Sequence, residues 1–251
     1  MNPRLTMATA GRVLRQIRHD PRTIGLLVLV PCVLIGLLAW VYKDTPTLMP
    51  GRTMFDQVGA SLLGIFPFVT MFLVTSIATL RERQSGTLER LLSMPVGKAD
   101  FVAGYALAFG LMATIQAVVA GSFAVFVLGL NVAGPAWMLI VVAVVDALLG
   151  TALGLFLSAF AATEFQAVQF LPAFVLPQFL LCGLLVPRGH LPNILHWVSD
   201  ALPLSYAVDA MSAISAKTHP GGDVAADVVT VLAFVAAAVL GGAATLRRRT
   251  A

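Results

Sequence analysis

Six long apolar segments constrain this chain more than any other feature of its sequence. They cover residues 24–42, 58–80, 102–130, 137–160, 167–186 and 224–246. About 20 consecutive apolar residues are needed for an α-helix to cross the hydrocarbon core of a bilayer, where a helix satisfies its own backbone hydrogen bonds. The segments therefore predict an all-α integral membrane protein with six transmembrane helices.

The composition excludes an ordinary soluble protein and makes a nucleic-acid partner unexpected. Hydrophobic residues make up 59% of the chain and charged residues 11%, against about 45–50% and 25% in soluble proteins. The net charge of +4 comes from basic residues that border the apolar segments and do not form a patch with aromatic residues. Both cysteines, Cys32 and Cys182, lie within apolar segments, so neither a disulfide framework nor a metal site is expected.

The first 22 residues combine arginines with one apolar face. On a helix, Val13, Leu14 and Ile17 share a face. Arginines flank it at Arg12, Arg15 and Arg18. This pattern predicts an amphipathic helix over residues 1–22 that lies in the membrane interface.

An arginine-rich start before an apolar run is also typical of a signal peptide. The run at 24–42 is long, however, and the LLAWVYKDT that ends it contains no small-x-small cleavage site. We expect it to be retained as the first span.

The distribution of basic residues predicts the orientation in the membrane. With six spans, twelve of the 16 Lys and Arg residues lie on the side of residues 1–22, 81–101 and 247–249, and four lie on the other side. Lys and Arg accumulate on the cytoplasmic side of membrane proteins. We therefore expect a multi-pass protein with both termini cytoplasmic, and the Ala, Val, Leu and Arg bias favours a bacterial plasma membrane.

Residues 81–101, RERQSGTLERLLSMPVGKADF, form the longest polar interruption between two spans. Thr87 can cap a short helix that ends before Pro95. Its apolar edge would consist of Leu88, Leu91 and Leu92. A short surface helix with such an edge indicates docking to a partner, whereas the alternative is a basic loop that only follows the positive-inside rule.

The same stretch resembles the coupling helix in membrane subunits of ABC-2 type ATP-binding-cassette exporters. The matching pattern is E-x-x-x-G-T-x-E-x-x-L-x-x-P, at Glu82, Gly86, Thr87, Glu89, Leu92 and Pro95. The hydropathy layout extends the resemblance over nearly the whole of residues 1–251 as a single transmembrane domain. Within the family, the daunorubicin-resistance-like branch of multidrug and lipid exporters is the more similar.

This resemblance implies an assembly with other subunits. Two copies of a cytoplasmic ATPase would bind the coupling helix, and a second copy of this permease, or a homologous one, would complete the membrane part. The residues implied in coupling are Glu82, Gly86, Thr87, Leu88, Glu89, Leu91, Leu92 and Pro95. The substrate would be a hydrophobic drug or a lipid-like molecule, moved outward through a membrane-embedded pathway surrounded by lipid.

Residues 187–223 are too polar for a span and too apolar for a free loop. Two helices of about 11 residues are expected at 192–202 and 204–215, a length typical of re-entrant or interfacial segments. Family members often follow the fifth span with a re-entrant helical pair. In this chain the pair would include Pro203, Tyr206 and Asp209, so we expect a hairpin on the outer side.

Missing motifs narrow the chemistry. No G-x-x-x-x-G-K-[ST] phosphate-binding loop occurs, since Gly97 and Lys98 are followed by Ala99. We therefore expect no enzyme activity and no cofactor in this chain, with ATP and Mg²⁺ bound by the partner ATPase. H-E-x-x-H and G-x-S-x-G are also missing and the four histidines are scattered, so no metal site is expected.

Three polar residues lie inside the apolar segments. Asp146 is ionisable, and such residues within spans are costly and often functional. It is a candidate for the substrate pathway or a proton relay, the alternative being an acid that is bonded to a neighbouring helix or placed in a small water pocket. Gln116 and Gln178 are weaker candidates for the same pathway, because buried amides commonly hold helices together.

Two local patterns predict helix geometry. Gly150, Gly154 and Ser158 recur every four residues and predict a close approach by another helix. Pro172 and Pro177 interrupt the fifth apolar segment, which should therefore be irregular.

Three functional hypotheses follow from the sequence. The first is the permease subunit of an ATP-driven exporter. The second is a proton-coupled secondary transporter that uses Asp146, although the two halves show no hydropathy repeat of the kind common in such proteins. The third is a membrane anchor for a cytosolic enzyme, which would have no need of the hairpin at 187–223.

Overall fold

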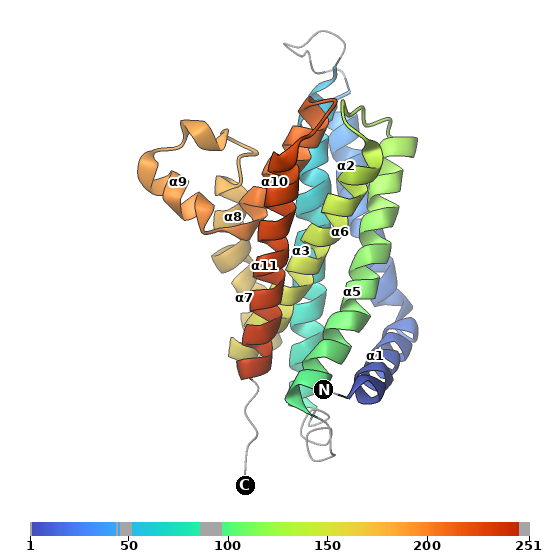
Figure 1. The fold of residues 1–251 in the computed structure, drawn as a ribbon. Helices are drawn as coiled ribbons and strands as arrows, with labels where there is room; N and C mark the ends of the chain where they lie inside the picture. The colour runs from blue at the N-terminus through green and yellow to red at the C-terminus, as the bar shows by residue number, and fades with distance from the viewer. Residues whose placement is uncertain (1, 44, 46–51, 86–96, 246–251) are drawn as a thin grey trace.

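A computed structural model describes residues 2–43, 45, 52–85 and 97–245. The regular elements in this part of the chain are all helical (Figure 1). The long helices are α2 (Pro21–Val41), α3 (Met54–Gln84), α5 (Lys98–Ser122), α6 (Ala136–Leu157) and α11 (Gly222–Thr245). The shorter α-helices are α1 (Pro3–Arg18), α7 (Glu164–Phe170), α8 (Leu176–Leu181), α9 (Asn193–Asp200) and α10 (Pro203–Ala216), and the π and 3-10 segments are η1 (Phe123–Val127), η2 (Ser158–Phe160), η3 (Leu171–Val175) and η4 (Arg188–His190).

Five continuous helical stretches are long and apolar enough to cross a membrane: Pro21–Val41, Met54–Gln84, Asp100–Val127, Ala136–Phe160 and Gly222–Thr245. They correspond to five of the six predicted spans. We refer to the end of the bundle that holds α1, the last turn of α3 and the end of α11 as the terminal end (Figure 1). Large apolar side chains such as Leu26, Trp40 and Leu240 are exposed on the outer faces of the bundle, as expected of a surface that contacts lipid.

The remaining predicted span, 167–186, is not one uninterrupted α-helix. It consists of α7, the π-helical η3 and α8, which together run from Glu164 to Leu181. Pro172 lies in η3 and Pro177 in the first turn of α8. Proline lacks a backbone N–H and displaces the carbonyl four residues earlier, which explains the irregularity that the sequence predicts.

The predicted N-terminal helix is present but shorter than 1–22. It ends at Arg18, and Asp20 then caps α2 by accepting hydrogen bonds from the Thr23 backbone N–H and hydroxyl at 3.2 and 2.6 Å. Pro21, in the first turn of α2, suits the start of a new helix. The chain therefore bends between the two helices.

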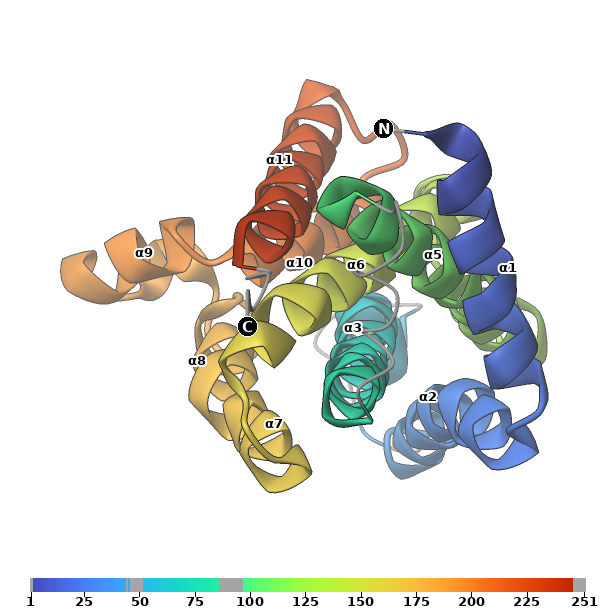
Figure 2. The same ribbon diagram turned by 90° about the horizontal axis from the view of Figure 1, so that it is seen from below.

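The apolar face of α1 packs along α5, as the view from the terminal end shows (Figure 2). Val13 is 3% exposed. A Cβ atom on Gly104 of α5 would lie only 2.7 Å from Cβ of Thr9, so this glycine allows the two helices to approach. The face of α1 that carries Arg15 and Arg18 remains exposed.

The centre of the bundle is the contact between α3 and α6 (Figure 2). A Cβ atom on Gly150 would lie 2.3 Å from the Phe68 carbonyl oxygen, and one on Gly154 would lie 2.6 Å from that of Phe72. The predicted close approach is thus confirmed at both glycines. Ser158, the third residue of the pattern, donates its hydroxyl hydrogen to the Leu155 carbonyl at 2.7 Å.

The two short helices predicted within 187–223 are confirmed as α9 and α10, in the half of the molecule away from the terminal end (Figure 1). Helix α10 is buried against α3, α6 and α11, whereas α9 projects from the bundle. Arg188 connects them, because its guanidinium donates to the carboxylates of Asp200 on α9 and Asp209 on α10. It also donates to the Ser199 hydroxyl at 2.6 Å.

Candidate functional site

The stretch 81–101 is described at its two ends only. Gly86, Thr87, Leu88, Glu89, Leu91, Leu92 and Pro95 lie outside the described residues. The stretch leaves α3 after Gln84 and returns at the start of α5, both at the terminal end (Figure 1). The candidate site is therefore built from these two ends and from the helices that contact them.

Helix α1 bonds to both ends of the stretch. Arg12 Nη1 donates to Oε1 of Glu82 in the last turn of α3 at 3.0 Å, and Arg12 Nη2 donates to the Tyr105 hydroxyl of α5 at 2.6 Å. Asp100, in the first turn of α5, accepts from the Asn2 backbone N–H at 2.7 Å. Glu82 is only 7% exposed, and hydrogen bonds to charged groups away from water are the stronger ones. Helix α1 therefore holds the end of α3 and the start of α5 in a defined relation.

On the other side, the last turn of α3 bonds to the connection between α6 and α7. Arg81 donates from Nε and Nη2 to the two carboxylate oxygens of Glu164 at 2.7 and 3.1 Å. Arg83 donates to the Ser158 carbonyl at 3.3 Å, and Gln84 donates to that of Ala162 at 2.8 Å. Side-chain polar contacts thus link the last turn of α3 to α1 through Arg12 and to α7 through Glu164.

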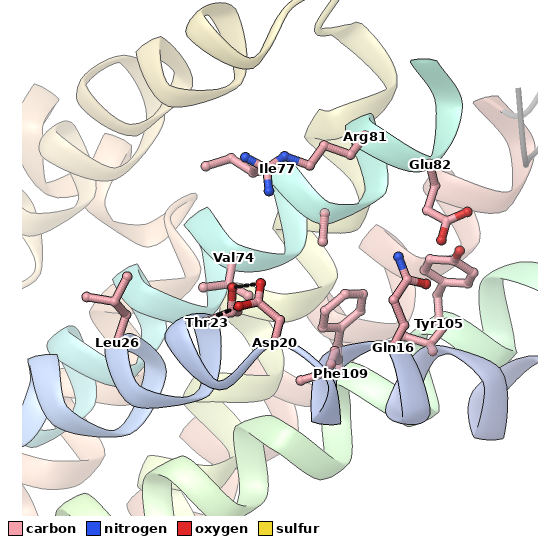
Figure 3. A pocket seen from close by; sticks show the side chains of 13 residues that line it. Gln16, Asp20, Thr23, Leu26, Val74, Ile77, Arg81, Glu82, Tyr105 and Phe109 are labelled. Carbon is pink, nitrogen blue, oxygen red and sulfur yellow. Dashed lines mark hydrogen bonds between the residues drawn. The ribbon is translucent and has the colours of Figure 1, made fainter. Parts of the chain in front are cut away.

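A cavity of about 330 Å³ lies beside this network, between α1, α2, α3 and α5 (Figure 3). Its polar lining includes Gln16, Asp20, Thr23, Arg81, Glu82 and Tyr105. Its apolar lining includes Val13, Ile17, Leu26, Val74, Ile77 and Phe109. The volume lies at the lower end of the range typical of small-molecule sites.

Asp146, Gln116 and Gln178 do not line this cavity. Asp146 is fully buried in α6 and faces Gly64 of α3. A Cβ atom added to Gly64 would lie 3.0 Å from Oδ2 of Asp146 and 3.0 Å from Sδ of Met211 on α10. Within the described residues the two carboxylate oxygens of Asp146 accept no hydrogen bond, and the buried amide of Gln116 has no partner either. Gln178 donates to the Phe174 carbonyl at 3.1 Å and accepts from the Leu204 N–H at 3.4 Å, so it connects α8 to α10 as an amide that holds helices together would.

Several residues of the terminal-end network were not predicted as site residues. Arg12 and Tyr105 lie 93 positions apart in the sequence, and Arg81 and Glu164 lie 83 apart. The sequence offered two signals: the arginines beside the apolar face of α1, and Glu164 between the fourth and fifth apolar segments. Such signals indicate a polar environment, but they do not indicate which residues meet.

We predict that Glu164→Gln destabilises the protein only slightly at neutral pH. Both side chains of the pair with Arg81 are well exposed, and exposed ion pairs contribute under about 1 kcal/mol. The Arg81 guanidinium lowers the pKa of Glu164, so the contribution is present above the unfolded-state pKa and is lost as the pH falls through the folded-state pKa. Melting temperatures of wild type and variant should therefore differ by a few degrees or less at pH 7 and converge in acid, and a gap that widens in acid would contradict this.

The fold and this site define the class of protein. Long apolar helices enclose a buried α3 and expose large apolar side chains on the outer faces of the bundle, so the chain is a multi-pass α-helical membrane protein. The family model of the ABC-2 type transporter matches residues 4–215. The chain therefore belongs to the ABC-2 type transporter family, which confirms the resemblance seen in the sequence.

Curated relatives with ABC transporter or permease names agree with this assignment. The linearmycin resistance permease protein LnrN of Bacillus subtilis (strain 168) is 26% identical over 181 residues, covering 72% of this chain and 47% of the relative. The probable multidrug ABC transporter permease YbhR of Escherichia coli (strain K12) is 27% identical over 157 residues, covering 62% and 43%. ABC transporter G family member 20 of Dictyostelium discoideum is 27% identical over 175 residues, covering 69% and 24%. The aligned part spans less than half the length of each of these relatives.

Proposed function

We propose that this chain is the permease subunit of an ATP-driven exporter in a bacterial plasma membrane, with both termini cytoplasmic. Two copies of a separate cytoplasmic ATPase would bind ATP and Mg²⁺, and a second copy of this permease or a homologous permease would complete the membrane part. The observation that carries the proposal is the polar network at the ends of 81–101, in a chain that belongs to the ABC-2 type family. The segment 167–186 would serve as the remaining one of six spans.

The network suggests how movement of a docked ATPase would reach the membrane helices. A force on residues 86–92 would act first on the last turn of α3, which is bonded to α1 through Arg12 and to α7 through Glu164. The hydrogen bond from Arg12 to the buried Glu82 contributes about 1.5–3 kcal/mol and the exposed Arg81–Glu164 pair under about 1 kcal/mol. Both are directional and resist sliding, unlike apolar contacts. The helices α1, α3 and α7 would then tilt together, whereas α10 and α11 would have no direct polar link to the moving end within the described residues.

The class of substrate that we propose is a hydrophobic drug or a lipid-like molecule. Two relatives carry the words linearmycin resistance and multidrug in their names, which favours a drug within this class. The pathway would lie at the membrane-embedded faces of spans one, two and five, where apolar side chains of α2 and α8, such as Leu29 and Leu180, are exposed.

A proton-coupled secondary transporter remains the second candidate because of one observation. Asp146 is fully buried, and no described residue donates to its carboxylate, which is an unusual environment for a structural acid. The exporter is the better supported function, since the secondary-transporter hypothesis leaves the family match and the residues at 82–95 without a role. A membrane anchor would leave them without a role as well.

We predict that Glu89→Lys and Leu91→Asp uncouple the chain from its ATPase. Glu89→Lys replaces attraction by repulsion if basic residues line the docking cleft of the ATPase, and like charges at a contact cost several kcal/mol. Leu91→Asp places a charge on the apolar docking edge. Both variants should lose co-purification with the partner ATPase, together with most of the substrate-stimulated ATP hydrolysis in membranes.

Lys43→Glu provides a charge reversal at the other end of the bundle, and this variant should keep both co-purification with the ATPase and substrate-stimulated ATP hydrolysis.

The purified permease alone should hydrolyse no ATP, because it carries no phosphate-binding loop. Full complex formation and stimulation by both docking variants, at wild-type expression, would refute the coupling assignment and favour the hypothesis based on Asp146.

A further inference from the structure

The cavity at the terminal end contains a carboxylate oxygen that no described residue satisfies. Glu82 lines the cavity, its side chain is 8% exposed, and Arg12 occupies its Oε1 atom. Its Oε2 atom is buried and accepts no hydrogen bond within the described part of the chain. Buried polar atoms are nearly always satisfied. What this wall of the cavity lacks is therefore a hydrogen-bond donor.

The charges around the cavity favour a cationic donor. Asp20 supplies a second carboxylate at the bend between α1 and α2. Arg81 is the only basic residue in the described lining, and Glu164 engages it through both carboxylate oxygens. Figure 3 shows the Glu82 carboxylate and the Tyr105 hydroxyl, both in the cavity lining, pointing toward each other.

The rest of the lining is suited to an apolar group. Leu26, Val74, Ile77 and Phe109 come from α2, α3 and α5. Leu26 is 62% exposed on the outer face of the bundle, so this part of the cavity wall continues into the surface that contacts lipid. A ligand with a charged head and an apolar tail would thus have its tail on the membrane side.

We propose that this cavity binds a cationic amphiphile, a molecule with a primary ammonium group on an apolar body, through Glu82 with support from Asp20. The ammonium would donate to Oε2 of Glu82, and the tail would lie along Ile77 and Phe109. The proposal concerns binding alone, and it does not depend on whether the bound molecule is also the transported one.

The test uses the full chain in lipid nanodiscs and three photoactivatable probes with the same twelve-carbon, diazirine-bearing tail. The probes are dodecylamine, dodecanol and dodecyl sulfate derivatives, which differ only in the charge of the head. After illumination, mass spectrometry identifies the labelled peptides. We expect half-maximal labelling of the peptides around Ile77 and Phe109 at a concentration about tenfold lower for the amine than for the alcohol, with the sulfate weakest.

Variants then assign this preference to the carboxylates. Glu82→Gln should remove the preference of the amine over the alcohol. Asp20→Asn should reduce it about threefold and keep α2 capped, since Asn is as good an N-cap as Asp. Ile77→Trp narrows the cavity, keeps both carboxylates and should strongly reduce labelling by the amine, so the test does not depend on Glu82→Gln remaining folded. Asp223→Asn removes an exposed carboxylate at the other end of the bundle, where Asp223 pairs with Lys217, and should leave the preference unchanged.

Three results would overturn the proposal. Equal labelling by amine and alcohol would show an apolar crevice without recognition of charge. Stronger labelling by the sulfate would show a site for an anionic head, such as a lipid phosphate. Labelling of the cavity that persists at the wild-type level in Ile77→Trp would place the bound amine elsewhere.

Discussion

Gly150→Ala is expected to prevent stable folding of this protein, although it adds a single methyl group. The new Cβ atom would lie 2.3 Å from the carbonyl oxygen, 3.0 Å from the carbonyl carbon and 3.1 Å from the Cα atom of Phe68. These are backbone atoms of α3, so no side-chain rotation relieves the contact. The two central helices would have to separate, at a cost of about 3 kcal/mol or more. We expect the yield of monodisperse protein in detergent to fall severely, and the melting temperature of any remaining protein to fall by more than 5 °C.

Gly25→Ala is the matched control for this substitution. Gly25 also lies in a predicted span, but a Cβ atom there would meet no atom within 4 Å. Alanine is the better helix former by about 1 kcal/mol, so this variant should be as stable as wild type or slightly more stable. Equal behaviour of the two variants would show that the α3–α6 contact is looser than the structure indicates.

Arg12→Glu should detach α1 from the ends of α3 and α5. It removes the partner of Glu82, whose side chain is 8% exposed, and puts a second negative charge beside it. Breaking a buried ion pair costs about 3–5 kcal/mol, and the lower figure applies because Arg12 itself is 30% exposed. The Tyr105 hydroxyl loses its 2.6 Å donor as well. Trypsin should therefore cleave after Arg15 and Arg18 at least tenfold faster than in wild type, since α1 must leave its site before a protease can unfold it.

A control and a rescue make this prediction specific. Arg15→Glu makes the same charge change three residues along α1, where the arginine bonds, among the described residues, to the Gly11 carbonyl of its own helix alone. It should leave cleavage after Arg18 unchanged. Arg12→Glu combined with Glu82→Arg should restore part of the protection, because it restores an opposite pair. Failure of the double variant to recover any protection would show that packing on α5, and not this ion pair, holds α1.

If the network at the terminal end transmits movement, the same variant should have a functional consequence. The end of α3 would remain bonded to the α6–α7 connection through Arg81 and Gln84, while α1 would no longer follow it. ATP hydrolysis by the assembled complex would then persist with reduced response to substrate. This pattern would differ from that of Glu89→Lys, which is expected to prevent assembly.

Part of the fold could be predicted because it depends on local properties of the chain. The positions of five spans follow from the length of apolar segments, and the break at 171–175 follows from Pro172. The amphipathic pattern of α1 indicated its buried face. The ends of helices were less predictable: α1 ends at Arg18 because Asp20 and Pro21 begin a new helix, a local signal that the apolar pattern of residues 1–22 obscured.

The candidate site was predictable only in part. The sequence motif placed Glu82 at a functional position, but the residues of the motif from Gly86 to Pro95 lie outside the described part of the structure, and their coupling role stays a prediction. Asp146 was expected to be buried within a span, and it is. The cavity beside Glu82 had no sequence signal, because its walls come from four helices and each wall looks like an ordinary apolar or interfacial segment.

Hydropathy alone was enough to identify a helical membrane protein, and the motif at 82–95 indicated the ABC-2 type family. Both depend on hydropathy and spacing along the chain, which do not require knowledge of which helices meet. Three contacts could be seen only in the folded protein: Gly150 lies against the backbone of Phe68, Arg12 pairs with Glu82 across 70 residues, and one oxygen of Glu82 accepts no hydrogen bond from the described residues. Such contacts depend on the relative rotation and depth of whole helices, and these are set by the summed packing of many side chains.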